Sequence, residues 1–268
     1  MTHQKRPGCA LVTGASGDIG AQIALRLAQD GWNIAVGYAT GIERAEEVAG
    51  RIRECGVSAM PIKIDVTSTT SVDDAFDALE DSLGQVTVLV NNAGIRSDGL
   101  VAGLSDDEWD AAISTNLSSV FRTSRRALGP MVRARFGRII NISSILAGRT
   151  IAGTGSYSAA KSGILGITRA MAIEVARRGV TVNAVCPGLV ETSMTEEVET
   201  FTQSVQRAVP MARPAQARDI AECVAFLASD RADYITGQSI AVDGGLSAQA
   251  FSLNEVRARP RVTPPFAV

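Results

Sequence analysis

Residues 11–20 of the chain read LVTGASGDIG, and this stretch decides the fold. Its first residues are typical of a buried strand, and the apolar spacing of Ala21–Ala28 directly after it is helical. A strand, a glycine turn and a helix in this order point free backbone N–H groups at an anion, which is the usual cradle of a dinucleotide pyrophosphate. Because many α/β proteins carry a glycine turn only to reverse the chain, the flanking strand and helix carry the inference.

Apolar strands and helical stretches alternate along the rest of the chain. Val and Ile fill the strands without alternating polar residues, which indicates a sheet covered on both faces, and helical crossovers make its strands parallel. The predicted strands are Cys9–Thr13, Asn33–Tyr38, Ala59–Ile64, Val86–Val90, Arg138–Ile142, Val180–Val185 and Ser239–Val242. The predicted helices are Ile19–Gln29, Ile42–Glu54, Val72–Ser82, Asp106–Arg135, Tyr157–Arg177 and Ala217–Ala228.

The sequence therefore predicts an α/β fold, a doubly wound parallel sheet of the Rossmann-like kind, in a single domain over residues 1–246. A Pro- and Arg-containing extension, residues 247–268, follows it. The composition of this extension disfavours regular structure. Disorder is the default expectation, and the alternatives are that it drapes over a neighbouring subunit or closes over a substrate site.

The composition fits a cytoplasmic enzyme domain. The chain has 268 residues and a formal net charge of −2, so nothing in it favours a nucleic acid or a membrane surface as a partner. Its four cysteines are scattered, which indicates reduced thiols in a reducing compartment. We expect neither a membrane span nor a signal peptide. The one histidine, His3, excludes His-based triads and poly-His metal sites.

Tyr157 and Lys161 stand four residues apart in a helical stretch, so their side chains project from the same face. A tyrosine loses its proton only near pH ~10, and a neighbouring ammonium acts to lower its pKa because it stabilises the phenolate. Ser144 follows the predicted strand Arg138–Ile142, at the edge where open parallel sheets bind their ligands. The three residues together predict acid–base chemistry at this edge.

Several motifs resemble those of the short-chain dehydrogenase/reductase family over roughly residues 8–246. The motifs are Thr13-Gly14 with Gly20, Asn91-Asn92-Ala93-Gly94, Asn116, Ser144, Tyr157, Lys161 and Cys186-Pro187-Gly188. Four further segments look most like β-ketoacyl-acyl carrier protein reductases, although they also occur in reductases of other substrates: residues 107–109, 115–122, 191–195 and 234–237. The resemblance implies a homotetramer that uses the two long helices, Asp106–Arg135 and Tyr157–Arg177.

The resemblance also implies a catalytic set of Asn116, Ser144, Tyr157 and Lys161. Tyr157 would donate its proton to the developing alkoxide while hydride arrives from the nicotinamide, and Ser144 would hydrogen-bond the same oxygen. Lys161 would lower the pKa of Tyr157, bind the nicotinamide ribose and relay protons through a water near Asn116. The alternative for Asn116 is a helix cap or a turn.

The glycine turn and the resemblance together predict the cofactor contacts. They are Gly14, Ser16, Gly17, Asp18, Ile19, Gly20, Tyr38, Ala39, Thr40, Arg44, Asp65, Val66, Asn92, Ala93, Gly94, Tyr157, Lys161, Pro187, Gly188, Val190 and Thr192. Asp65 is the family's adenine contact, and it could equally cap the turn Asp65-Val66-Thr67.

The end of the second strand predicts NADPH rather than NADH. An NAD-selective site has a carboxylate about 20 residues past the glycine turn, where it holds the ribose 2′-OH and repels a 2′-phosphate. Residues 37–40 supply no carboxylate. We expect Arg44 or the Thr40-Gly41 backbone to meet the 2′-phosphate; alternatively, Arg44 is a helix-face residue that pairs with nearby glutamates.

Asp18 departs from the family's glycine turn, which has a glycine at this position. A carboxylate beside a diphosphate is repelled unless it turns away, and capping of the following helix is the expected reason for it to do so. Weaker cofactor binding is a possible consequence.

The substrate is predicted from weaker signals. Leu189–Pro210 resembles the family's substrate lid, with Thr192 near the nicotinamide carboxamide. Arg135 and Arg178 match positions that β-ketoacyl reductases use to dock the acidic acyl carrier protein near the active-site mouth, although cations are also favoured at helix C-termini. Three functions compete: reduction of a carrier-bound β-ketoacyl group of fatty acid or polyketide type, oxidation or reduction of small alcohols, sugars or steroids, and nucleotide sensing without turnover.

Overall fold

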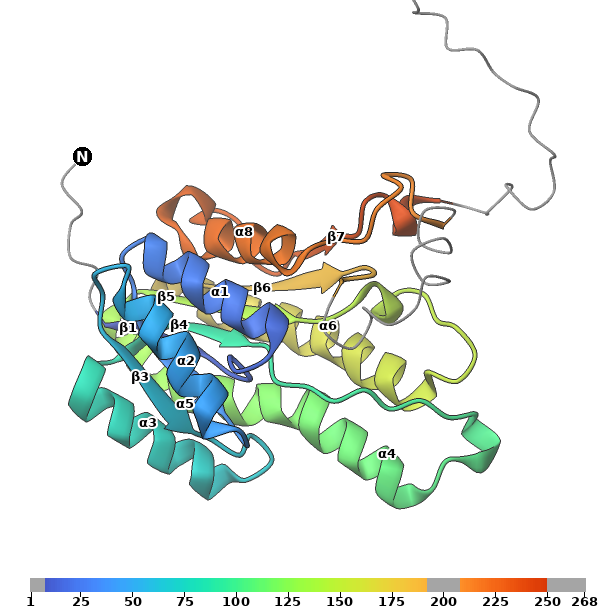
Figure 1. Cartoon of the computed structure of the whole chain (residues 1–268), viewed down its shortest axis with the longest axis horizontal. Coiled ribbons are helices and arrows are strands. Elements are labelled where there is room, and N and C mark those ends of the chain that lie inside the picture. The colour runs from blue at the N-terminus through green and yellow to red at the C-terminus, as the bar shows by residue number, and fades with distance from the viewer. Residues whose placement is uncertain (1–7, 192–207, 250–268) are drawn as a thin grey trace, which may run out of the picture.

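A seven-stranded sheet forms the centre of the chain in its computed structural model, which describes residues 8–191 and 208–249 (Figure 1). All neighbouring strands pair in parallel, in the order β3-β2-β1-β4-β5-β6-β7. The strands are β1 (Cys9–Val12), β2 (Asn33–Tyr38), β3 (Ala59–Lys63), β4 (Val86–Asn91), β5 (Gly137–Ile142), β6 (Val180–Pro187) and β7 (Ser239–Val242). The predicted doubly wound parallel sheet is confirmed.

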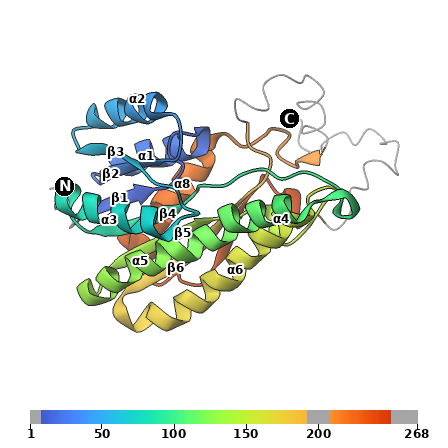
Figure 2. The same ribbon diagram turned by 90° about the horizontal axis from the view of Figure 1, so that it is seen from below.

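Helices cover both faces of this sheet. One layer consists of α1 (Asp18–Gln29), α2 (Ile42–Arg53) and α8 (Ala217–Ala228). The other consists of α3 (Thr69–Leu83), α5 (Ser119–Ala134) and α6 (Gly155–Val175). Figure 2 shows α5 and α6 side by side, with α4 (Asp106–Ile113) continuing the line of α5.

The strand sequences explain why two layers are needed. In β1, Ala10 and Val12 pack under α1 and α8, whereas Leu11 points to the opposite face, among residues of α3, α5 and α6. Side chains alternate between the two faces of a strand, so an uninterrupted apolar strand requires cover on both. Trp32 anchors the first layer and Phe76 the second, and both are fully buried.

The predicted helix Asp106–Arg135 is in fact interrupted. A π-helical turn, Ser114–Ser118, separates α4 from α5, and it contains Asn116. Such turns are rare and concentrate at functional sites. Periodicity alone did not predict the interruption, because one wider turn changes the helical phase only slightly.

Strand order places a crevice at one edge of the sheet. β1 lies between β2 and β4, so the chain winds outward through β2 and β3 and then crosses back to begin again at β4. Open α/β sheets bind ligands where the winding direction reverses, beyond the carboxyl ends of the strands. The glycine turn follows β1 and Asn92-Ala93-Gly94 follows β4, so both motifs meet there. Within the described residues, the structure has no helix that is long and apolar enough to span a membrane.

Candidate active site

The glycine turn after β1 is held in place by the end of β4. The side-chain amide of Asn92 donates to the carbonyl oxygens of Thr13 and Gly14, at 3.0 and 3.1 Å. The Thr13 hydroxyl in turn accepts from the backbone N–H groups of Asn92 and Ala93, both at 3.0 Å. Gly14 has a positive φ of 63°. A Cβ on Gly20 would lie 2.4 Å from the Gly14 oxygen, so the turn and the first turn of α1 approach too closely for any side chain there.

Asp18 does not cap α1, and the predicted capping role is wrong. The N-cap is Gly17, which has no side chain with which to cap the helix, while Asp18 is the first helical residue. The Asp18 carboxylate is directed across to α2, where Oδ1 lies 3.5 Å from Nη2 of Arg44. An acid in the first turn still interacts favourably with the helix dipole, so Asp18 supports α1 without capping it.

The end of β2 and the residues after it, Tyr38, Ala39 and Thr40, carry no charged side chain. Tyr38 is half-buried, and Ala39 and Thr40 are exposed. Gly41 has the left-handed conformation and is the N-cap of α2. A cavity of about 300 Å³ adjoins this corner, between α1 and α2, and it is lined by Ser16, Gly17, Asp18, Ala21, Gln22, Arg44, Glu47, Val48, Arg51 and Ala217.

The remaining predicted cofactor residues occupy the ends of β3 and β6. Asp65 follows β3, and its Oδ1 accepts from the backbone N–H of Thr67 at 2.9 Å and from its hydroxyl at 2.7 Å, so the turn-capping role is present. These bonds lower the pKa of the Asp65 carboxyl. Pro187 ends β6, and Gly188 donates to the Val242 oxygen at 3.0 Å.

Two predicted features of the lid lie at or beyond the limit of the described residues. Val190 forms an isolated parallel bridge with Ala215. Thr192 and most of the predicted lid Leu189–Pro210 lie outside the described residues, as does nearly all of the extension 247–268.

The four predicted catalytic residues come from three neighbouring elements. Ser144 follows β5, Tyr157 and Lys161 lie one turn apart on α6, and Asn116 lies in the π-helical turn before α5. Tyr157 is hydrogen-bonded to the Ser144 side chain. The Lys161 ammonium donates to the Ile142 oxygen at 2.9 Å and lies 5.5 Å from the centre of the Tyr157 ring. The structure therefore brings Ser144, Tyr157 and Lys161 together.

Burial governs the acid–base properties of Tyr157. It raises the pKa of the phenol above its ordinary value, and the Ser144 hydrogen bond offsets this only in part. Of the charged groups in the described residues, Arg96 lowers this pKa and Asp98 raises it. The net direction is therefore opposite to the predicted lowering by Lys161, because burial has the largest effect on this pKa. A raised pKa keeps the phenol protonated at neutral pH, which is the form that a general acid needs.

Lys161 is affected by burial in the opposite sense. It is fully enclosed, and desolvation lowers its pKa from 10.5 to about 8, partly offset by Cys186. An ammonium has three donors, and the Ile142 oxygen takes one of them. The other two N–H donors suit hydrogen bonds to the two adjacent hydroxyls of a ribose.

Asn116 holds the segment that follows β4. Its side-chain oxygen accepts from the Ile95 N–H and its side-chain nitrogen donates to the Ile95 oxygen, both at 3.0 Å. A Cβ on Gly94 would lie 2.6 Å from the Asn116 oxygen, which explains the glycine. Asn116 therefore neither caps a helix nor turns the chain through its side chain. It joins the π-helical turn to the residues beside Tyr157.

Sequence reasoning missed the residues that hold this loop over Tyr157. The hydroxyls of Ser97 and Ser156 are hydrogen-bonded at 2.9 Å, and Gly99 donates to the Gly153 oxygen at 2.8 Å. Arg96 and Asp98, one on each side of Ser97, form an exposed ion pair. Fifty-nine residues separate Ser97 from Ser156, so no local pattern could have revealed the contact.

Arg135 and Arg178 do not border this crevice within the chain. Each precedes a strand, so both lie at the amino edge of the sheet, and the Arg135 guanidinium donates to the Arg177 oxygen at 3.3 Å. Tyr157 lies in the first turn of α6 and Arg178 just beyond its last residue, so nearly the full length of this helix, roughly 30 Å, separates them. Both arginines therefore lie far from the Tyr157 of their own chain, and their predicted docking of a carrier protein stays a prediction.

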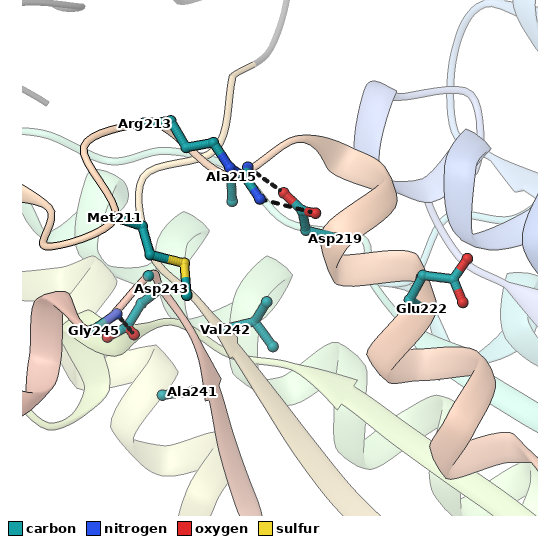
Figure 3. A pocket seen from close by; sticks show the side chains of 10 residues that line it. Met211, Arg213, Ala215, Asp219, Glu222, Ala241, Val242, Asp243 and Gly245 are labelled. Atoms are coloured by element: carbon teal, nitrogen blue, oxygen red, sulfur yellow. Dashed lines mark hydrogen bonds and ion pairs between the residues drawn. The ribbon is translucent and has the colours of Figure 1, made fainter. Parts of the chain in front are cut away.

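A second cavity, of about 460 Å³, contains none of the catalytic residues. It lies between the carboxyl end of β7 and the start of α8 (Figure 3). Arg213 and Asp219 form an ion pair at 2.7 Å in its wall, and the Asp243 carboxylate accepts from the backbone N–H groups of Gly245 and Ser247. These charged side chains are therefore occupied within the wall itself.

The crevice at β1, β4 and β5 fits a nicotinamide dinucleotide. The glycine turn provides backbone N–H groups at the start of α1, and the lack of side chains at Gly14 and Gly94 lets these segments pack closely against Ala93 and Asn116. Lys161 supplies donors for a ribose beside Ser144 and Tyr157. No group of three or more His, Cys, Asp or Glu side chains in residues 8–191 and 208–249 could hold a metal ion.

Comparison with known proteins gives consistent matches. Residues 14–247 match a family model described as enoyl-(acyl carrier protein) reductase. The 3-oxoacyl-(acyl-carrier-protein) reductase FabG of Staphylococcus aureus (strain Mu50) is 44% identical over 238 residues, which is 88% of this chain and 97% of the relative.

Two solved structures are also similar. A putative gluconate dehydrogenase from Agrobacterium tumefaciens has a TM-score of 0.88 at 33% identity, over 93% of this chain and 99% of its own. A variant of actinorhodin polyketide ketoreductase with NADPH has a TM-score of 0.86 at 38% identity, over 91% of this chain and 98% of its own.

Proposed function

The chain belongs to the short-chain dehydrogenase/reductase family, and on this premise we propose that it reduces the β-keto group of a carrier-bound acyl chain with NADPH. The observation that carries the proposal is the convergence of Ser144, Tyr157 and Lys161 at the carboxyl edge of the sheet, beside the glycine turn. The similarity to a 3-oxoacyl reductase along nearly the whole of that relative supports the substrate class.

The protein residues supply the acid–base part of the reaction. A bound dihydronicotinamide supplies the hydride that reaches the carbonyl carbon. Tyr157 donates its phenol proton to the carbonyl oxygen, so that the carbon–oxygen double bond becomes a hydroxyl without charge building up on oxygen. Ser144 donates a hydrogen bond to the same oxygen. The phenolate that remains, whose ring centre lies 5.5 Å from the Lys161 ammonium, then regains a proton from solvent.

NADPH rather than NADH follows from the end of β2. Residues 37–40 supply no carboxylate that would hold a ribose 2′-OH, and Arg44 lies beside the glycine turn. We expect catalytic efficiency with NADPH to exceed that with NADH. Equal efficiency with the two cofactors would remove this part of the proposal.

Docking of a carrier protein on Arg135 and Arg178 requires a second copy of the chain. Both arginines lie at the far end of α5 and α6 from Tyr157, so an antiparallel pairing of these helices between two copies would bring them to the partner's crevice. This agrees with the tetramer that the family resemblance implies. Replacing both by glutamate should raise KM for a carrier-bound substrate and leave a small ketone unaffected. Equal losses on the two substrates would refute the docking.

The experiment that tests the function is NADPH oxidation against a β-ketoacyl carrier conjugate and a panel of small ketones. Tyr157→Phe is the control, because it keeps the ring and removes the proton donor. We expect turnover of the conjugate by the wild-type chain and a loss of at least ~100-fold in the variant. Activity that survives in Tyr157→Phe would count against the mechanism itself.

Reduction or oxidation of small alcohols or sugars is the second candidate. The exposed ion pair Arg96–Asp98 favours it, because it gives the entrance beside Tyr157 a polar lining. Faster turnover of polar ketones than of the acyl conjugate in the same panel would select it. Nucleotide sensing without turnover is the weakest candidate, since all four catalytic residues are present.

A further inference from the structure

Asp18 has a position that the cofactor site makes hard to explain. It is the first residue of α1, at the turn that would receive the cofactor diphosphate, and a carboxylate there brings like charges together. The helix does not need it as a cap, since Gly17 is the N-cap. Its carboxylate is one-third exposed and is directed at the Arg44 guanidinium, with 3.5 Å between Oδ1 and Nη2.

Arg44 lies where a cation could meet a 2′-phosphate. It belongs to the first turn of α2, three residues after the left-handed Gly41 that follows β2, and its side chain is 63% exposed. A side chain as long and as exposed as this has many rotamers unless a partner selects one. The contact with Asp18 uses one nitrogen of a group that carries five donors, so the guanidinium can bind an anion at the same time.

The charged residues that line the same cavity show on which wall Asp18 and Arg44 each stand. Arg44 and Arg51 lie seven residues apart on one face of α2, and both line the cavity of about 300 Å³ with Ser16, Gly17 and Asp18. The Asp18 carboxylate therefore stands at the α1 wall of a cavity whose α2 wall carries these two cations and one carboxylate, that of Glu47. Arg44 is directed from α2 towards the glycine turn.

We propose that Asp18 is a positioning residue for NADPH: it holds Arg44 against the glycine turn, where the guanidinium neutralises the carboxylate and meets the 2′-phosphate. The inference rests on the proposed NADPH dependence. On this proposal Asp18 favours the binding of NADPH over NADH. Its repulsion of the diphosphate is the same for both cofactors, whereas only NADPH has the 2′-phosphate that Arg44 would bind.

Titration calorimetry with NADP⁺ and NAD⁺ on the full chain tests the proposal without turnover. The quantity compared is the ratio of the two dissociation constants, in which the diphosphate cancels. We expect Arg44→Gln to lower the preference for NADP⁺ about tenfold and Asp18→Asn about threefold. The double variant should lose no more than Arg44→Gln alone, since the two residues act as one unit.

Asp219→Asn is the matched control. Asp219 is also a first-turn acid paired with an arginine, Arg213, but it lies on α8. Removal of the Asp219 charge should leave the ratio of the two dissociation constants unchanged. A changed ratio in this variant would overturn the proposal, because any lost first-turn acid would then have the same effect as loss of Asp18.

The other outcomes separate this inference from the proposed function. If the wild-type chain prefers NADP⁺ and Asp18→Asn keeps or increases that preference, the positioning role is refuted and the NADPH assignment stands. If the wild-type chain binds both cofactors equally, the NADPH assignment fails together with the inference. Additive losses in the double variant would also refute the coupling.

Discussion

Lys161 is a single functional residue that destabilises the folded chain. Its ammonium is fully enclosed, and its pKa falls from 10.5 to about 8 because burial disfavours the charge. The unfolded chain therefore binds this proton more tightly than the folded one between those two pH values. The destabilisation is fully present below about pH 8 and disappears as pH rises towards 10.5.

Lys161→Met should consequently stabilise the chain without cofactor at pH 7, by about 2 kcal/mol. Removing the buried charge should stabilise the chain by about 3 kcal/mol. Losing the hydrogen bond to the Ile142 oxygen should destabilise it by about 1 kcal/mol. The gain should vanish near pH 10, which urea denaturation at the two pH values measures. Lys63→Met, at an exposed lysine of β3, is the control and should show no such pH dependence. An equal gain at both pH values would contradict the account.

Arg96 and Asp98 act on the pKa of Tyr157 in opposite directions, and each can be removed separately. Asp98→Asn removes a charge that raises the pKa, and Arg96→Gln removes one that lowers it. Carbonyl reduction requires the protonated phenol, so its rate falls as pH rises through this pKa. We expect that fall to move to lower pH in Asp98→Asn and to higher pH in Arg96→Gln, in pH profiles of kcat/KM. Shifts in the same direction would exclude the electrostatic explanation.

The close approach of the glycine turn to α1 leaves no room for a side chain at position 20. A Cβ on Gly20 would lie 2.4 Å from the Gly14 oxygen and 2.8 Å from the Ala15 Cα, and both are backbone atoms that cannot rotate away. Gly20→Ala should therefore destabilise the chain by about 2 kcal/mol, as overpacking does, and weaken cofactor binding because the turn must shift.

Gly17→Ala is the matched control for the glycine turn. Its Cβ would meet the Gly14 oxygen at 3.5 Å, an ordinary contact, and its φ is −89°. Loss of the glycine at this N-cap should cost no more than about 1 kcal/mol. Thermal unfolding of the two variants compares them directly, and similar losses in both would mean that the close approach at Gly20 does not govern stability.

A buried arginine links distant parts of the whole molecule. Arg138 of β5 is 3% exposed and forms an ion pair with Asp233, while Asp230 lies 3.9 Å away. Both acids follow α8, ninety or more residues along the chain, and both are largely exposed. The interaction ties the amino edge of β5 to the connection between α8 and β7.

The two ends of this ion pair should respond unequally to substitution. Asp233→Asn leaves a buried guanidinium with a weakened partner and should cost about 2–3 kcal/mol. Arg138→Met leaves an exposed carboxylate in water and replaces the charge by an apolar side chain, so its loss should be at most half as large. Urea denaturation measures both, and kcat should remain unchanged, because the pair lies at the edge of the sheet away from Tyr157. A larger loss for Arg138→Met would contradict the argument.

The sequence predicted the strands and most helices because their signals are local. Continuous apolar runs such as Val86–Val90 require burial on both sides, wherever in the sheet the strand lies. The π-helical turn at Asn116 was not predicted, and the hydrogen bonds of that side chain are to Ile95, twenty-one residues away, where no local pattern records them. The capping role of Asp18 was predicted from its neighbours in the chain, whereas its observed partner, Arg44, lies on another helix.

The amino-acid sequence by itself determined the doubly wound sheet, the glycine turn and the identity of the residues at the crevice. These depend on interactions within a few residues, which a pattern records directly. The folded arrangement was needed to show that burial outweighs the Ser144 hydrogen bond and Arg96 in setting the pKa of Tyr157, and that Arg135 and Arg178 lie at the far edge of the sheet. Desolvation and charge–charge interactions depend on distances in space, and segments far apart in the chain create them when they pack together.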